Sequence, residues 1–240
     1  MKLVSGLIAG AVMASATLIV QAHSAPLQAQ DVAPPITGGG IFAPGWQGKV
    51  DPGQTSAPGT PSKLEDAKFT KQGDTFMIET GPAASYWNPA NVAKGDYTVK
   101  ATFNEPKFQN RNDHPHPYGV FIAGNDLGTD QSSMLYCEAY GSGTFIVRGF
   151  GPAAFRMNGG RGEANPAVHK AAGIGQPVSQ EIEMSVKGDN VTCSINGTQV
   201  ASYPKAQVVA PGKLQSTDGV YGIRFAHNTE GSVTGFGLVK

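Results

Sequence analysis

The sequence predicts an all-β protein built as a two-sheet antiparallel β-sandwich. Three observations lead to this fold class: short runs that alternate apolar and polar residues, glycine-rich turns between the runs, and no long stretch with helical periodicity. The chain has 240 residues with 32 glycines and 17 prolines, and only 15% of its residues are charged, which is typical of a turn-rich protein. A closed barrel is the alternative, but glycines at the ends of many runs favour bent strands over uniform closure.

Residues 1–24 are predicted to be a secretory signal peptide. Lys2 is followed by an uncharged, mostly apolar run over residues 3–20, and Ala22 and Ser24 supply the small residues that precede a cleavage site. A run of about 18 residues is also long enough for a membrane anchor, but glycine, serine and threonine within it weaken that alternative. We therefore expect a secreted or periplasmic protein with no membrane association after cleavage.

The remaining chain divides into two parts. Residues 25–66 are rich in proline and glycine and show little apolar periodicity, so we expect an irregular leader in which Trp46 packs back onto the domain. Residues 67–240 carry the alternating pattern and are expected to form the β-sandwich domain. The expected strands lie at 75–79, 97–104, 120–123, 135–140, 145–147, 182–187, 191–195, 200–203, 219–227 and 233–239.

Each strand is justified by alternation or by a turn. Residues 97–104 place Tyr97, Val99, Ala101 and Phe103 on one face. Residues 141–143 (Gly-Ser-Gly) and 188–190 (Gly-Asp-Asn) each separate two apolar runs, which indicates hairpins. The Asn196-Gly197 pair predicts a tight hairpin turn, because both central residues of a type I′ turn need positive φ.

Two cysteines, Cys137 and Cys193, lie within predicted strands and have apolar neighbours two residues away. Both side chains should face the core. In an oxidising compartment they could form a disulfide, or they could lie apart as small apolar side chains.

Several segments in this order resemble a known superfamily. They are Tyr118-Gly119-Val120-Phe121-Ile122, Leu135-Tyr136-Cys137-Glu138-Ala139-Tyr140, Ser194-Ile195-Asn196-Gly197 and Gly219-Val220-Tyr221-Gly222-Ile223. Together they resemble the concanavalin A-like jelly-roll superfamily, which includes LamG-like domains, and within it the bacterial secreted domains of the 3-keto-disaccharide hydrolase type. The resemblance implies a jelly roll over about residues 67–240. Members include lectins, glycan-binding modules and glycosidases, so the fold does not choose among these functions.

The segment around Glu138 is the main candidate site. Tyr136, Glu138 and Tyr140 should share the face opposite the core, where aromatic rings could pack on a sugar and the carboxylate could accept its hydroxyl groups. An outer polar face without a ligand is the alternative. Glycosidases of the laminarinase-like branch carry a Glu-x-Asp-x-Glu strand; Glu138 has no such local partner, although another strand could supply one.

The segment from Asn112 to Tyr118 contains His114 and His116, each followed by proline. Imidazole groups suit acid–base chemistry or metal binding, but the segment could equally be a rigid polar loop. Arg148, Arg224 and His227 are expected on strands near Glu138, although Arg224 and His227 should face opposite ways if one strand carries both. If the site is catalytic, Glu138 and His116 are the candidate general acid and base.

The function predicted from the sequence is that of a carbohydrate-active domain that binds or cleaves a glycoside. The alternatives are a non-catalytic module for carbohydrate or protein, and a structural envelope protein. The 18 basic and 18 acidic residues balance, which argues against a nucleic-acid partner. No cofactor is expected, apart from calcium at a candidate loop with Asn125, Asp126 and Asp130.

Overall fold

A computed structural model describes residues 36–109 and 115–239. The predicted signal peptide and His114 lie outside these residues. The described chain forms two eight-stranded sheets that face each other across an apolar core. No helix among the described residues has the length and apolar character needed to cross a membrane.

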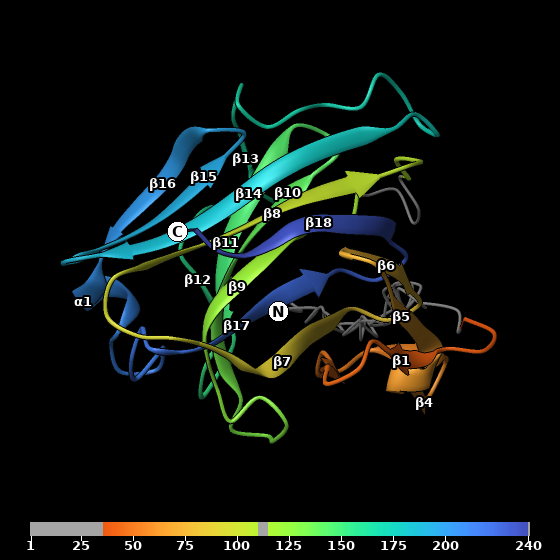
Figure 1. Cartoon of the computed structure of the whole chain (residues 1–240), viewed down its shortest axis with the longest axis horizontal. Coiled ribbons are helices and arrows are strands. Elements are labelled where there is room, and N and C mark those ends of the chain that lie inside the picture. The colour runs from red at the N-terminus through yellow and green to blue at the C-terminus, as the bar shows by residue number, and fades with distance from the viewer. Residues whose placement is uncertain (1–35, 110–114, 240) are drawn as a thin grey trace, which may run out of the picture. The chain divides into compact units, whose positions relative to one another are not determined.

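Sheet A has the order β1-β5-β6-β18-β8-β14-β15-β16, and all neighbours except β1 and β5 are antiparallel. Figure 1 shows β14, β8 and β18 side by side. The strands of this sheet are β1 (Gly40–Phe42), β5 (Ala67–Gln72), β6 (Thr75–Thr80), β8 (Tyr97–Glu105), β14 (Val178–Lys187), β15 (Asn190–Ile195), β16 (Thr198–Pro204) and β18 (Glu230–Leu238).

Sheet B has the order β12-β11-β10-β9-β17-β7-β2, and β13 also pairs with β11. Its strands are β2 (Gln47–Val50), β7 (Ala84–Ala93), β9 (Tyr118–Asn125), β10 (Ser133–Tyr140), β11 (Thr144–Phe150), β12 (Phe155–Arg156), β13 (Glu163–Ala164) and β17 (Gly219–Phe225). Two short strands, β3 (Thr55–Ala57) and β4 (Thr60–Pro61), form a separate hairpin. The helical turns are Leu64–Asp66 and α1 (Lys205–Val208).

The two-sheet antiparallel sandwich is confirmed, and all ten expected strands are present. The core consists of the residues that alternation assigned to the inner faces, such as Val99, Ala101 and Phe103 on β8. Cys137 on β10 and Cys193 on β15 form a disulfide, so a covalent bond joins sheet B to sheet A.

The leader that was expected to be irregular over residues 25–66 contains short strands where the structure describes it, from residue 36 onward. Residues 40–42 form β1, which pairs with β5, and residues 47–50 form β2, which pairs with β7. These strands are too short to show a period of two, and they gain their hydrogen bonds from strands far away in sequence. Trp46 does pack onto the domain, with its ring centroid 5.1 Å from that of Phe69 and 4.5 Å from that of Phe76.

Candidate functional site

Strand β10 presents Tyr136, Glu138 and Tyr140 on the face of sheet B that points away from the core. Its alternate residues, such as Leu135 and Cys137, belong to the core between the sheets. Tyr136 and Tyr140 instead belong to a second apolar cluster on the outer face. The alternation predicted from the sequence therefore holds, because successive side chains of a strand point to opposite faces.

The register of sheet B brings Arg224 to Glu138. Glu138 on β10 lies opposite Gly119 on β9, and Gly119 lies opposite Arg224 on β17. The Arg224 side chain reaches past this glycine, and its Nη1 atom donates a hydrogen bond of 2.5 Å to Glu138 Oε1. A Cβ atom at position 119 would lie only 1.9 Å from the Cys137 carbonyl oxygen, so this row of the sheet requires glycine there.

Asp51, which directly follows β2, completes a buried ion-pair cluster. Arg224 Nη2 forms an ion pair with Asp51 Oδ2. The side chains of Glu138, Arg224 and Asp51 are 0%, 8% and 11% exposed, respectively. We refer to these three residues as the Arg224 cluster. Sequence reasoning missed Asp51, because it lies in an Asp-Pro-Gly segment that resembles an ordinary turn.

The surroundings of the Arg224 cluster shift its proton affinities. Complete burial raises the pKa of the Glu138 carboxyl group, and the charge and hydrogen bond of Arg224 offset part of this rise. Burial lowers the pKa of the Arg224 guanidinium, but Asp51 and Glu138 outweigh this effect and raise it well above its ordinary value. Arg224 therefore stays charged and holds one oxygen of each carboxylate.

The expected row of open tyrosines is not what the structure contains. The Arg224 guanidinium lies 4.5 Å from the centroid of the Tyr136 ring, so it covers one ring face. Phe150 packs on Tyr136 as well, with ring centroids 5.8 Å apart. Tyr136 is 5% exposed and Tyr140 is 9% exposed, so little of either side chain is available to a ligand.

A cavity of about 250 Å³ lies over this face of the sheet. We call it the Glu138 cavity. It brings together seven residues that the sequence analysis singled out, from strands and loops far apart in the chain. They are His116, Tyr136, Glu138, Tyr140, Arg148, Arg224 and His227. Asp51 and Gln54 also line this cavity, and both come from the segment that was expected to be irregular.

His116 and His227 meet at the edge of the Glu138 cavity. Their ring centroids are 4.2 Å apart and the ring planes are inclined by 65°. The opposite directions expected for Arg224 and His227 do not arise, because β17 ends at Phe225 and His227 lies beyond it. The backbone N–H of Ala226 donates to the Pro117 carbonyl oxygen at 2.9 Å, which ties the two histidine-bearing segments together.

Three buried polar atoms of the cavity wall have no hydrogen-bond partner within the described part of the chain. They are Glu138 Oε2, Arg148 Nε and Arg224 Nε. Arg148 is fixed by a different atom, because its Nη2 donates to the Gly160 carbonyl oxygen at 2.6 Å. Among the described residues, one carboxylate oxygen and two guanidinium N–H groups of the lining residues therefore have no protein partner.

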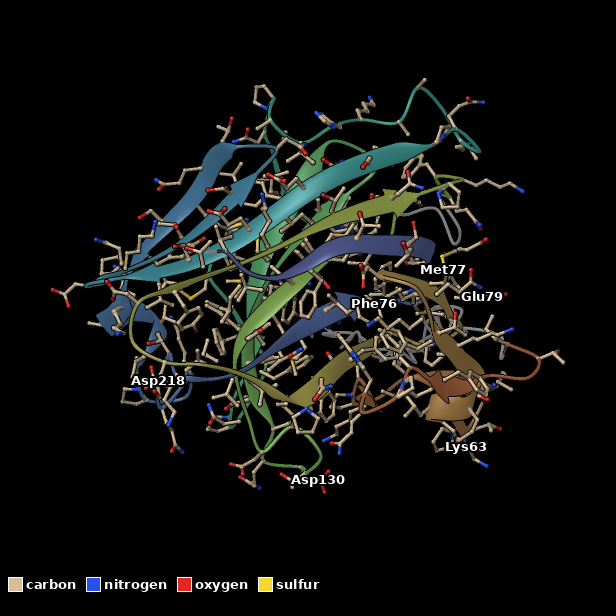
Figure 2. All side chains as sticks on the ribbon, in the orientation of Figure 1. Lys63, Phe76, Met77, Glu79, Asp130 and Asp218 are labelled. Atoms are coloured by element: carbon tan, nitrogen blue, oxygen red, sulfur yellow. A yellow bond between two sulfur atoms is a disulfide. The ribbon has the colours of Figure 1, made fainter. Side chains whose placement is uncertain are left out.

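The candidate calcium loop is held by hydrogen bonds and an ion pair. The Asn125 amide nitrogen donates to the carbonyl oxygens of Ala123 and Asp218, and the Lys49 ammonium group lies 3.9 Å from Asp130. Asp130 itself lies on the loop between β9 and β10 (Figure 2). Within residues 36–109 and 115–239, no group of three or more His, Cys, Asp or Glu residues could hold a metal ion.

The fold has known structural relatives. It is similar to a carbohydrate-binding module from Bacillus subtilis, with a TM-score of 0.52 and 7% identity, covering 82% of this chain and 96% of that chain. A Bacillus subtilis protein of unknown function with a galectin-like fold matches with a TM-score of 0.48 and 12% identity, covering 80% of this chain and 88% of that chain. An endo-beta-1,3-glucanase from Pyrococcus furiosus matches with a TM-score of 0.47 and 14% identity, covering 72% of this chain and 78% of that chain.

At these identities the likeness concerns the fold alone. The chain has a β-sandwich of the jelly-roll type, as the resemblance to the concanavalin A-like superfamily implied. No family model matches the sequence, and no curated protein matches it.

Proposed function

We propose that this chain is an exported carbohydrate-binding protein, and that the Glu138 cavity holds one sugar unit or the end of a glycan chain. The observation that carries the proposal is the set of unpartnered atoms on the cavity wall, Glu138 Oε2, Arg148 Nε and Arg224 Nε. Buried polar groups are nearly always hydrogen-bonded. A ligand with several hydroxyl groups can donate to the carboxylate and accept from both guanidinium groups.

The size and charge of the cavity support a small, neutral ligand. Its volume of about 250 Å³ lies just below the ~300–1,000 Å³ typical of pockets for drug-sized ligands. Its wall contains two carboxylates, Asp51 and Glu138, and two guanidinium groups, Arg148 and Arg224, so these charges cancel. Tyr136 and Tyr140, which also line the cavity, add apolar contact for the C–H groups of a sugar.

Binding fits the Arg224 cluster better than hydrolysis does. Glycoside hydrolysis ordinarily uses two carboxyl groups, one of which donates a proton. Here Arg224 contacts both Asp51 and Glu138, so one oxygen of each carboxylate is already engaged by a guanidinium group. With Arg148 in the same cavity wall, two guanidinium groups balance the two carboxylates.

Glycoside cleavage is the second candidate, and one observation favours it. His116 and Glu138 line the same cavity, and an acid–base mechanism needs two titratable groups within reach of one substrate position. In that case His116 would be the proton donor or acceptor.

A glycan array followed by calorimetric titration tests the proposal. Arg148→Gln is the first variant, because Arg148 is partly exposed and its loss should leave the fold intact. Glu138→Gln is the second, and Glu183→Gln on the outer face of β14 is the matched control. We expect binding of a neutral glycan that weakens at least tenfold in the first two variants and is unchanged in the control. Unchanged affinity in both cavity variants would refute the proposed site.

A turnover screen on ordinary and 3-keto disaccharides separates the two candidates. A binding protein gives no product at any pH. Product formation that disappears in His116→Gln but not in Glu183→Gln would establish cleavage instead.

A further inference from the structure

A second cavity, of about 440 Å³, lies at the inner side of β17. Its apolar wall consists of four aromatic rings, and we call it the aromatic cavity. The Trp46 ring centroid lies 4.5 Å from that of Phe76 and 5.6 Å from that of Phe236, and the Tyr221 centroid lies 5.5 Å from that of Phe236. Phe76, on β6, is labelled in Figure 2. Trp46 and Phe236 are only partly buried, so they present ring surface to the cavity.

Departures from regular strand pairing build this cavity. Val220 and Gly222 of β17 pair with Val92 and Trp87 of β7, so residues 88–91 stand opposite the single residue Tyr221. In β18, Thr234 pairs with Thr102 of β8, and Gly237 pairs with Lys100. Three steps along β18 thus match two steps along β8, which leaves one extra residue around Phe236. Bulges of this kind re-aim side chains and often occur beside functional sites.

The looped-out part of β7 contributes the amide groups of the cavity. Asn88 and Asn91 both line it, and both are partly exposed. The Asn88 side-chain oxygen accepts a hydrogen bond of 2.9 Å from the Ala90 backbone N–H, which fixes the loop and leaves its amide nitrogen available to a ligand. The Asn91 side chain has a donor and an acceptor group in the same cavity.

The charged groups of the wall favour a neutral ligand. Lys71 and Asp74, from the β5–β6 hairpin, supply one positive and one negative charge. The Lys71 ammonium group already lies 5.5 Å from the Phe76 ring centroid, where it disfavours a second cation against the same rings. Asp74 disfavours an anion in the same way. Aromatic rings beside amide groups then suit a ring with C–H faces and hydroxyl groups.

The aromatic cavity is separate from the Glu138 cavity. The two share no lining residue. Tyr221 lies on the core side of β17, and Arg224 lies on its outer side. A ligand in one cavity therefore does not contact the wall of the other.

We propose that the aromatic cavity is a second saccharide-binding site, which packs a neutral sugar ring against Trp46, Tyr221 and Phe236 and holds its hydroxyl groups with Asn88 and Asn91. This site does not depend on the function of the Glu138 cavity. If both sites bind the same polysaccharide, the first contact raises the effective concentration of that polysaccharide at the second site, which increases the overall affinity.

Fluorine NMR of the full chain labelled with 5-fluorotryptophan tests this site directly. The chain has two tryptophans, Trp46 in the aromatic cavity and Trp87 on the outer face of sheet B, so each signal reports on one side. The Trp87→Phe variant assigns the signals. The probes are maltotriose, cellotriose, laminaritriose, xylotriose and kestose, with choline and glucuronate as charged comparators.

We expect at least one neutral probe to shift the Trp46 signal saturably. Asn91→Ala should weaken that binding roughly fivefold to tenfold, the loss of about one hydrogen bond, whereas Arg148→Gln should leave it unchanged. No shift of the Trp46 signal with any neutral probe in large excess would overturn the proposal. A larger response to choline or glucuronate, or an Asn91→Ala variant with wild-type affinity, would overturn it as well.

Discussion

Replacing Arg224 with methionine should destabilise the protein strongly, and more at neutral pH than at acid pH. The variant leaves Asp51 and Glu138 buried without their shared cation. Removing one partner of a buried ion pair typically costs about 3–5 kcal/mol, because an uncompensated charge stays behind. For a domain of this size each kcal/mol lowers Tm by about 2–4 °C, so the expected fall is roughly 6–20 °C.

The pH dependence follows from Glu138. Arg224 is the main group that opposes the rise in the Glu138 pKa caused by burial, so its removal raises that pKa further. A carboxyl group whose pKa is raised in the folded state stabilises the fold below its unfolded pKa, ~4.3, and this stabilisation is lost as the pH rises through the folded-state value. The variant should therefore lose more stability at pH ~7 than at pH ~4.5, both relative to the wild type.

Thermal and urea unfolding, followed by circular dichroism at both pH values, measure this effect. Arg156→Met is the matched control, because Arg156 is exposed on β12 and its replacement should change the free energy of unfolding by no more than ~0.5 kcal/mol. A loss below ~1 kcal/mol for Arg224→Met at neutral pH, or a loss of equal size at both pH values, would refute the reasoning about the Arg224 cluster.

Three further predictions concern the fold around the candidate site. Gly119→Ala should destabilise the protein by at least ~2 kcal/mol, since its Cβ would lie 1.9 Å from a backbone oxygen; urea unfolding checks this, and a wild-type midpoint would contradict it. The Cys137→Ala/Cys193→Ala variant should lose about 4 kcal/mol, from opening a loop with a sequence separation of 56 residues; equal stability of oxidised and reduced wild type would argue against the bridge. Burial raises the pKa of Glu105 to about 7, so wild-type stability should fall by roughly 2–3 kcal/mol as the pH rises from ~4.5 through that value. Glu105→Gln should flatten this dependence in denaturation curves at several pH values, and a variant with an unchanged pH profile would show that Glu105 does not cause it.

Alternation of apolar and polar residues was sufficient to predict the long strands. In β10 it placed Cys137 in the core and Glu138 on the opposite face, as the structure confirms. Alternation did not predict β7. Residues 88–91 of this strand, which include Pro89, lie outside its regular pairing with β17, and they show no period of two. Alternation also failed for β1 and β2, whose pairing depends on strands elsewhere in the chain.

The candidate site was predicted as a set of residue types but not as a structure. His116, Glu138 and Arg148 were expected near one another and do line one cavity. The ion pairs of Arg224 with Asp51 and Glu138 were not expected, since these residues come from three distant parts of the sequence. The expected open tyrosine surface was wrong because Arg224 and Phe150 cover Tyr136.

The sequence by itself determined the fold class, the strand faces and the identity of seven of the fourteen residues that line the Glu138 cavity. These properties follow from local chemistry, because a strand directs its side chains to alternate faces whatever it pairs with. Only the tertiary structure decided which strands are neighbours, and so that Arg224 extends over Gly119 to Glu138 and meets Asp51 from the other side. Strand order depends on contacts between residues far apart in the chain, and a local pattern does not encode them.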